Sequence, residues 1–291
     1  MSPNLDAGTL RIALPKGRMQ VAVFALLDAA GLSVRMGSRA YRPTIAAGRF
    51  NAKILKPQNI IEMLVAGSRD IGFAGADWVD EIGADLVELL DTGLDPVRLV
   101  AAAPDELLVE GALPAQPLRV ATEYPNTAER WITANGIDAR VVRSFGATEV
   151  FPPDDADVII DNTATGATLA ANGLTIVATV ATSSTRLYAN PAALEDAARR
   201  AAIDGMVMLL RSVLDARQRV MLEVNVATPQ LEAVCALLPC MREPTIATLH
   251  DNAGFAVKAA VARDILPTLV PRIKQAGGSD IVISPIAQIV P

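Results

Sequence analysis

Residues 156–172 have the sequence ADVIIDNTATGATLAAN, and this stretch decides the fold. It opens with an apolar run that ends at Ile160, continues through small and hydroxylated residues, and closes on an alanine-rich segment. A short apolar run of this kind is typical of a strand buried in a sheet, and the segment 170–172 suits a helical turn. The stretch therefore predicts strand, loop and helix in succession, which is the repeating unit of an α/β fold.

The loop in this stretch carries groups that suit a sugar phosphate. Asp161, at the carboxyl end of the predicted strand, can accept hydrogen bonds from two vicinal hydroxyls. Directly after it, the segment 165–169 offers hydroxyls and backbone N–H groups at a helix N-terminus, which suits a phosphate. The spacing matches the two ends of a ribose 5-phosphate. A helix capped by Thr or Asp after a strand has the same pattern, so the stretch alone leaves both interpretations open.

The same alternation of strands and helices continues on either side. Strands are expected at residues 10–14, 53–55 and 70–74, and in a second series at 97–103, 118–121, 139–142, 156–160 and 174–180. Helical patterns lie between many of them, which predicts a mostly parallel sheet covered by helices on both faces. One long helix is expected over residues 191–217, because apolar side chains recur there with helical spacing.

The pattern changes after Arg217. Strands are expected at residues 220–226, 245–249, 255–261 and 280–283, with helices at 230–238 and 264–275. This βαββαβ order predicts a ferredoxin-like domain over residues 217–291. Small appended domains of this type often bind an amino acid or an oligomer partner, but the fold alone does not show which.

Composition excludes several classes of function. The 291 residues are 51% hydrophobic, and 26 Lys and Arg against 32 Asp and Glu leave a net charge of −6, without the basic excess of a nucleic-acid-binding protein. Polyphosphate ligands would need a few local cations, backbone dipoles and a divalent metal. The single His250 gives a histidine metal site or a Ser-His triad little material, and Cys235 and Cys240 form no CxxC pair.

Targeting signals are absent from the sequence as given. The first residues show no basic stretch followed by an apolar core, and no apolar run reaches the roughly 20 residues needed to cross a bilayer. We therefore expect a soluble, cytoplasmic protein that does not interact with membranes.

Three further places could carry chemistry. Lys16 and Arg18 follow the first predicted strand, where ligands of open α/β sheets bind, and could clamp a pyrophosphate; a solvated turn would look the same. Gly75 ends another strand and permits close approach of a ligand to the backbone. Glu149, together with Asp161, could hold Mg²⁺ or sugar hydroxyls, although a lone Glu near a turn is usually solvated.

In their joint order these segments resemble the long form of ATP phosphoribosyltransferase, the first enzyme of histidine biosynthesis. The resemblance rests on residues 10–18, 70–75, 119–126, 161–174, 183–187 and 237–246, and so runs nearly end to end. It implies a periplasmic-binding-protein-like catalytic unit of two α/β lobes, one formed by residues 1–95 with 182–216 and the other by 96–181. Residues 217–291 would be a ferredoxin-like regulatory domain.

The resemblance also implies the reaction and the residues that perform it. The enzyme would transfer the phosphoribosyl group of phosphoribosyl pyrophosphate to N1 of ATP with Mg²⁺, under feedback inhibition by histidine. Asp161 would hold the ribose hydroxyls, and Lys16, Arg18 and the Gly75 backbone would contact ATP phosphates or pyrophosphate, with Glu149 also in the site. The segment that holds the 5-phosphate would be Thr165, Gly166, Ala167, Thr168 and Leu169. Histidine would bind at Asn225, Met241 and Thr245, and the chain would form a hexamer, with a dimer as the active form.

The sequence also departs from the family pattern. Residues 152–157, PPDDAD, stand where the family usually has a GxAD approach and are one residue shorter, and Asn225 replaces an Asp found in some members. Two other functions fit the same lobes, a paralogue without turnover and a solute-binding receptor. The presence of Lys16, Arg18 and the 165–169 loop favours the enzyme, and a receptor would need an export signal.

Overall fold

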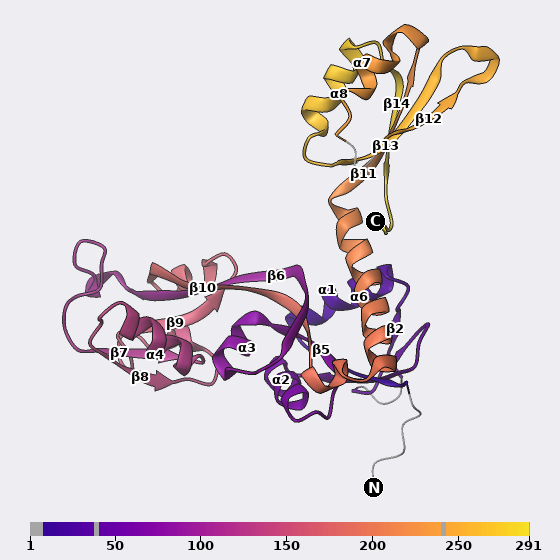
Figure 1. The fold of residues 1–291 in the computed structure, drawn as a ribbon. Coiled ribbons are helices and arrows are strands. Elements are labelled where there is room, and N and C mark those ends of the chain that lie inside the picture. Colours follow the sequence, from indigo (N-terminus) through magenta and orange to yellow (C-terminus); the bar gives the residue numbers. More distant parts are fainter. Residues whose placement is uncertain (1–7, 38–40, 240–242, 291) are drawn as a thin grey trace. The chain divides into compact units, whose positions relative to one another are not determined.

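The computed structural model describes residues 8–37, 41–239 and 243–290. The chain divides into two compact units, residues 1–204 and 205–291, and each unit is described by itself. In Figure 1, the colour runs from indigo at the N-terminus to yellow at the C-terminus, so the first unit is drawn from indigo to orange.

The first unit is built on one eight-stranded sheet that serves both lobes. Its strands, in spatial order, are β4 (Phe50–Leu55), β1 (Leu10–Pro15), β5 (Ile71–Gly75), β10 (Leu174–Ala189), β6 (Val87–Pro104), β9 (Val158–Thr163), β7 (Leu118–Thr122) and β8 (Ala139–Arg143). The strands β4, β1 and β5 are parallel in one lobe, and β9, β7 and β8 are parallel in the other. The long strands β6 and β10 lie antiparallel between the two groups.

The sheet is therefore mixed rather than mostly parallel. The sequence predicted only the second half of β6, because Gly93, Asp95 and Pro96 disfavour a strand in the first half. The structure accommodates these residues with left-handed backbone at Gly93 and Asp95 and with several shifts of register between β6 and β10. Two short strands, β2 (Val34–Arg35) and β3 (Thr44–Ile45), pair with each other outside the main sheet and carried no sequence signal.

Helices follow the strands of both lobes, as expected. They are α1 (Arg18–Ala29), α2 (Pro57–Val65), α3 (Ala76–Ile82), α4 (Pro125–Ala134) and α5 (Ala167–Ala171). Both α2 and α4 begin with Pro at the first helical position, where the missing N–H costs no hydrogen bond. The inward faces are apolar, and Ile60, Ile61 and Leu64 of α2 are fully buried.

The helix predicted over residues 191–217 is interrupted. A 3₁₀ turn occupies Pro191–Leu194, and the helix α6 runs from Ala197 to Arg217. Asp196 starts α6 afresh, because its carboxylate accepts a hydrogen bond from the Arg199 N–H at 2.9 Å, the geometry of a helix N-cap. The apolar side chains with helical spacing, at residues 203, 207, 210 and 214, all lie after the break, so their pattern does not reveal it.

Each lobe contains an equivalent Arg–Asp ion pair that joins two neighbouring strands. Arg11 of β1 binds Asp70, just before β5, through its backbone N–H at 2.7 Å and through its guanidinium. In the other lobe, Arg119 of β7 binds Asp157, just before β9, through its backbone N–H at 2.7 Å and through its guanidinium. The two lobes therefore repeat one local design, although the sequence shows no obvious repeat.

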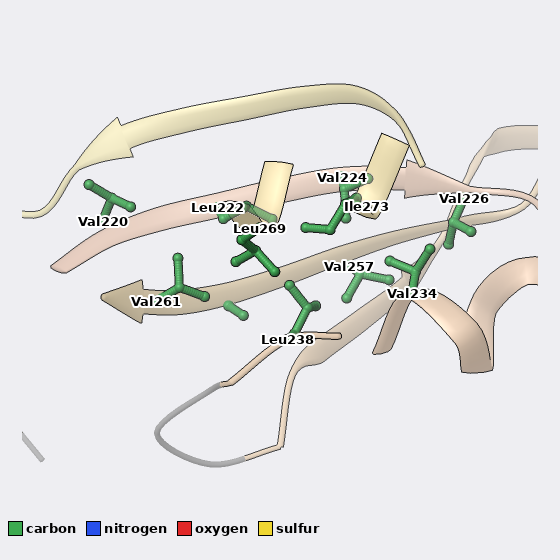
Figure 2. Packing of buried hydrophobic residues seen from close by; sticks show 11 residues of the cluster. Val220, Leu222, Val224, Val226, Val234, Leu238, Val257, Val261, Leu269 and Ile273 are labelled. Atoms are coloured by element: carbon green, nitrogen blue, oxygen red, sulfur yellow. The ribbon is translucent and has the colours of Figure 1, made fainter. Parts of the chain in front are cut away.

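The second unit has the predicted ferredoxin-like topology. Its elements are β11 (Arg219–Val226), α7 (Leu231–Cys235), β12 (Thr245–Thr248), β13 (Phe255–Ala262), α8 (Leu266–Gln275) and β14 (Ser279–Pro285). The antiparallel sheet has the order β12-β13-β11-β14. Alternate residues of β11, from Val220 to Val226, pack with Leu269 and Ile273 of α8 in a buried core (Figure 2). The other face of the sheet carries the polar side chains of β11.

A buried carboxylate connects α3 to α4. Glu81 of α3 is only 5% exposed, and its oxygens accept hydrogen bonds from the backbone N–H groups of Asn126 and Thr127 at 3.0 and 2.8 Å. The Thr127 hydroxyl donates a third bond at 2.8 Å. These N–H groups belong to the first turn of α4, which has no partners of its own for them. Glu81 thus serves as the cap of a helix in the other lobe.

Glu81→Ala should destabilise the protein by about 2–4 kcal/mol, because it leaves the N–H groups of Asn126 and Thr127 and the buried Thr127 hydroxyl without their acceptor. Denaturant unfolding of the purified protein would measure the loss. Glu129→Ala, at an exposed position of α4, is the matched control and should change the free energy of unfolding by less than about 0.5 kcal/mol. Equal stability of the two variants would show that Glu81 does not support α4.

Candidate active site

Two adjoining pockets open at the carboxyl ends of the strands in the first unit. One, here called the lysine pocket, is lined by Lys16, Arg18, Met19, Pro57, Gly75, Asp77, Trp78, Asp95, Val97, Tyr124, Asn162 and residues 183–185. The other, here called the acidic pocket, is lined by Arg18, Glu123, Gly146, Ala147, Glu149, residues 161–165, Thr168 and Leu169. Arg18 and Asn162 line both pockets, so the two spaces meet at these side chains.

The structure brings together most of the residues singled out in the sequence. Lys16 and Gly75 line the lysine pocket, and Arg18 borders both. The acidic pocket collects Glu149 and Asp161 with three residues of the loop, namely Thr165, Thr168 and Leu169. Segments about 150 residues apart in the sequence thus face one another, as the expected position at the strand ends requires.

Two members of the loop use their N–H groups within the loop itself. Gly166, with φ 83°, donates its N–H to the Thr163 hydroxyl at 2.8 Å, and Ala167 donates its N–H to the Thr165 hydroxyl at 3.3 Å. Neither residue lines the acidic pocket. Their role in this structure is to shape the turn into α5, while the hydroxyl-bearing residues of the loop face the open space.

Gly75 is required by its surroundings. A Cβ atom at this position would lie 2.2 Å from Oδ1 of Asp77, so any side chain would displace that carboxylate. Lys16, on the neighbouring strand end, holds its ammonium 5.8 Å from the centre of the Tyr41 ring, within range of a cation–π contact. These two contacts fix the wall of the lysine pocket that belongs to the first lobe.

Asp161 has the perturbed carboxyl of the site. Its pKa is raised to about 6, chiefly by burial and also by the negative charges of Glu123 and Glu149, against the lowering effect of hydrogen bonds from the Asn162 N–H and the Thr148 hydroxyl. The Asn162 N–H lies 2.6 Å from Asp161 Oδ1. A carboxyl that is crowded by two others in one pocket favours either a proton or a cation next to it.

The lysine pocket also contains a hydrogen-bond network that the sequence did not predict. Tyr124 donates its hydroxyl to Asp77 Oδ2 at 2.8 Å and accepts from Asn162 Nδ2 at 2.9 Å. Ser183 donates to Asp77 Oδ1 at 2.7 Å and accepts from the Asp77 N–H at 3.0 Å. Residues this far apart along the chain give no spacing signal, so only the fold reveals the network.

The residues expected to bind histidine are in the second unit. Asn225 of β11 alternates with the buried residues Val224 and Val226, so it lies on the face of the sheet away from α7 and α8. Thr245 of β12 lies on the same face, because it pairs with Lys258 of β13, which in turn pairs with Glu223 of β11. Asn225 donates to Asp280 at 3.2 Å, and Thr245 stands opposite Lys258 of β13. Met241, the third residue expected there, lies outside the described residues.

Neither a preformed metal site nor a membrane span occurs in the described part of the chain. No group of three or more His, Cys, Asp or Glu side chains is arranged there to hold a metal ion. No described helix is both long and apolar enough to cross a membrane. The carboxylates that share the acidic pocket are Glu123, Glu149 and Asp161.

Known proteins show the same organisation. The sequence model of the ATP phosphoribosyltransferase family (HisG) matches residues 56–212, and that of the HisG C-terminal domain matches residues 216–288. The ATP phosphoribosyltransferase of Chlorobium phaeobacteroides is 36% identical over 277 residues, which is 94% of each chain. The chain belongs to the ATP phosphoribosyltransferase family. It is therefore a transferase, and its reaction is the first step of histidine biosynthesis.

Other members of the ATP phosphoribosyltransferase family agree with this assignment. The enzyme of Pelotomaculum thermopropionicum is 34% identical over 287 residues, 97% of this chain and 99% of that one. The solved ATP phosphoribosyl transferase (HisG:HisZ) complex from Thermotoga maritima superposes with a TM-score of 0.62 at 26% identity, covering 71% of this chain and 98% of that chain. The catalytic fold is thus shared with the Thermotoga protein, and the C-terminal family domain marks this chain as the long form with a regulatory domain.

Glu123→Gln should lower the pKa of Asp161, because it removes one of the negative charges that raise it from its usual range to about 6. The titration of the Asp161 carboxyl carbon, followed by NMR, would move to lower pH by roughly half a unit. Glu129→Gln removes a charge from the surface of the same lobe and should leave the titration in place.

The raised pKa also affects stability. The folded protein holds the Asp161 proton more tightly than the unfolded chain does, so this group's contribution to the free energy of unfolding falls as pH rises from about 4 to about 6. An Asp161 titration at the ordinary pKa of a carboxyl in the unsubstituted protein would contradict both statements.

Proposed function

We propose that the two pockets divide the substrates of this ATP phosphoribosyltransferase between them. Phosphoribosyl pyrophosphate lies in the acidic pocket, with its ribose hydroxyls on Asp161 and its 5-phosphate at the Thr165–Thr168 turn. ATP lies in the lysine pocket, with its phosphates near Lys16 and the Gly75 backbone. Arg18, which borders both spaces, is placed to bind the pyrophosphate between them. The observation that carries this proposal is that one cleft collects these residues from both lobes.

The proposed geometry suits a displacement at the anomeric carbon. The nucleophile, N1 of the adenine ring, already has a lone pair, so no activated Ser, Cys or His is needed. The chain has to align two polyanions and stabilise the charge on the departing pyrophosphate. Lys16 and Arg18 provide fixed positive charge on one side of the cleft, and the guanidinium can bind two phosphate oxygens at once. Asp161 fixes the position of the ribose relative to the adenine ring.

Mg²⁺ fits the acidic pocket as a companion of the substrate. Mg²⁺ in such sites takes one or two carboxylates and completes its shell with phosphate oxygens and water, so a cage made of protein alone is not expected. Glu149 and Asp161 are the carboxylates we assign to it, and the mutual repulsion in this pocket is what a cation would relieve. When bound, the ion neutralises pyrophosphate charge. Calorimetric titration of phosphoribosyl pyrophosphate with and without Mg²⁺ would test the fit independently of turnover.

Asp161→Ala should lower kcat/KM for phosphoribosyl pyrophosphate by about a hundredfold, because each lost charge-assisted hydrogen bond contributes about 1.5–3 kcal/mol. Formation of phosphoribosyl-ATP from the two substrates with Mg²⁺ would be assayed, with removal of pyrophosphate. Asp155→Ala, an exposed carboxylate of the same lobe, should retain full activity. Absence of turnover by the unsubstituted protein would favour the paralogue that binds ligands without catalysis.

We further propose that residues 217–291 form the histidine-binding domain, that residues 1–95 with 182–216 form the first catalytic lobe, and that residues 96–181 form the second. The C-terminal family domain, matched over residues 216–288, supports the first of these. Asn225 and Thr245 are the polar residues we assign to the amino acid, both on the exposed face of the sheet. The family resemblance also supports a homohexamer, a dimer as its active form, and a cytoplasmic location.

Thr245→Ala should leave the uninhibited rate unchanged and weaken inhibition by histidine about tenfold, since it removes one hydroxyl from the proposed effector site. The assay is run across a range of histidine concentrations. Thr268→Ala removes a hydroxyl from α8, whose partner is the Ile265 carbonyl of the same helix, and serves as the control. If Thr245→Ala abolished turnover itself, the division between regulatory and catalytic domains would be wrong.

A further inference from the structure

The hydrogen bonds around Tyr124 form a relay with one direction. Asp77, in the first turn of α3, accepts the Tyr124 hydroxyl at 2.8 Å, and the Tyr124 oxygen accepts Asn162 Nδ2 of β9 at 2.9 Å. Tyr124 directly precedes α4, so the three side chains come from separate segments and from both lobes. All three line the lysine pocket, and none of them has a role in the assignment of substrates above.

The chemistry of the groups fixes the orientation of the Asn162 amide. A carboxylate accepts hydrogen bonds and does not donate them, so the Tyr124 proton must point to Asp77. Tyr124 keeps that proton, because burial and the Asp77 charge raise the pKa of its hydroxyl. The lone pair of Tyr124 then requires a donor, so Asn162 presents its NH₂ group to Tyr124. The amide oxygen, Asn162 Oδ1, therefore points the opposite way.

The relay is held rigidly. Tyr124 is fully buried, and its ring lies 4.5 Å from that of Trp78 between centroids, tilted by 34°. Asp77 is fixed by Ser183 on its other oxygen, at 2.7 Å, and leaves no space for a side chain at Gly75. A rotation of the Asn162 amide would put a carbonyl oxygen against the Tyr124 oxygen, with no proton between them. The orientation is thus enforced from three sides.

Asn162 Oδ1 is an acceptor available to a ligand. No described residue donates a hydrogen bond to it, whereas Asp161, its neighbour on the strand, points to the acidic pocket alone. Asn162 lines both pockets and so stands where the two substrates must meet. Phosphate groups are themselves acceptors and have no use for such an oxygen. The ribose hydroxyls of phosphoribosyl pyrophosphate are assigned to Asp161, and the donor next to the nucleophilic N1 is the 6-amino group of adenine.

We propose that Asn162, oriented by Tyr124 and Asp77, accepts a hydrogen bond from the adenine 6-amino group and so selects adenine over bases with a carbonyl at that position. The inference rests on the proposed placement of ATP in the lysine pocket. A purine with a 6-carbonyl would set its oxygen against Asn162 Oδ1, and the amide cannot turn to donate because the turn would set Oδ1 against the Tyr124 oxygen. Two acceptors would then face each other without a proton.

The test compares ATP with ITP, which carries a carbonyl in place of the 6-amino group. Dissociation constants of both nucleotides are measured by calorimetry with the full chain, since N1 of inosine bears a proton and turnover is not comparable. The unsubstituted protein should bind ATP more tightly. Tyr124→Phe keeps the ring beside Trp78 but frees the amide, and the ratio of the two constants should fall about tenfold.

A second variant, at Asp77, should also release the orientation of the Asn162 amide. Asp77→Asn can donate to Tyr124 as well as accept, so the direction of the relay is no longer enforced and the ratio should fall again. Tyr188→Phe is the matched control: Tyr188 is also buried but lines neither pocket, and the ratio should stay unchanged. Thermal unfolding of each variant separates loss of fold from loss of selectivity.

The outcomes separate the inference from the assignment that it rests on. An unchanged ratio in folded Tyr124→Phe and Asp77→Asn would overturn the role of the relay, and so would equal binding of ATP and ITP by the unsubstituted protein. A loss confined to phosphoribosyl pyrophosphate affinity would assign Asn162 to the ribose instead. If Lys16→Ala left ATP binding intact, the placement of ATP itself would fail.

Discussion

The antiparallel pairing of β6 and β10 is the constraint on which the catalytic unit depends. These two strands extend one sheet through both lobes. A group of mutually parallel strands pairs antiparallel with β10 on one side, and a second such group pairs antiparallel with β6 on the other. Because hydrogen bonds run without interruption from lobe to lobe, the strand ends that bear Lys16 and Asp161 are placed by backbone geometry rather than by loops. The pairing departs from regular register at several positions along β6 and β10, among them the stretch around Gly93 and Asp95.

Charge is divided between the walls of the cleft. Both cations, Lys16 and Arg18, come from the first lobe, which also contributes Asp77 and Asp95, whereas the second lobe contributes Glu123, Glu149 and Asp161. A chain with a net charge of −6 therefore attracts polyanions only locally, through two cations and the dipoles of the loop. The acidic wall suits hydroxyls and a metal ion, and the basic wall suits phosphates. Under the proposed assignment, this division gives the phosphates and the hydroxyls of the two substrates different walls of the cleft.

The sequence predicted features that depend on neighbouring residues, and it missed contacts between segments that are distant in the chain. Lys16, Gly75 and the 165–169 loop were predicted to share a site because each lies at or after the end of a strand, and strand ends meet at one edge of the sheet. The structure places Lys16, Gly75, Thr165, Thr168 and Leu169 on the two adjoining pockets. The βαββαβ order likewise determined the second fold. The relay from Asp77 to Asn162 was missed, since its members are joined only after three elements pack. The first half of β6 was missed because Gly93 and Pro96 disfavour a strand that the neighbouring strands stabilise. The helix expected over residues 191–217 is interrupted because Asp196 caps a new helix, α6.

Arg18 borders both pockets, and under the proposed assignment of substrates this shared position couples the two substrates electrostatically. A single guanidinium cannot give its full attraction to two polyanions at once, so the arrival of one weakens the hold on the other. By reciprocity, this antagonism is the same whichever molecule enters first. The same sharing eases departure of pyrophosphate once the triphosphate chain of the product competes for the cation. A residue at the boundary between two sites thus links occupancy of the ternary complex to the escape of its product.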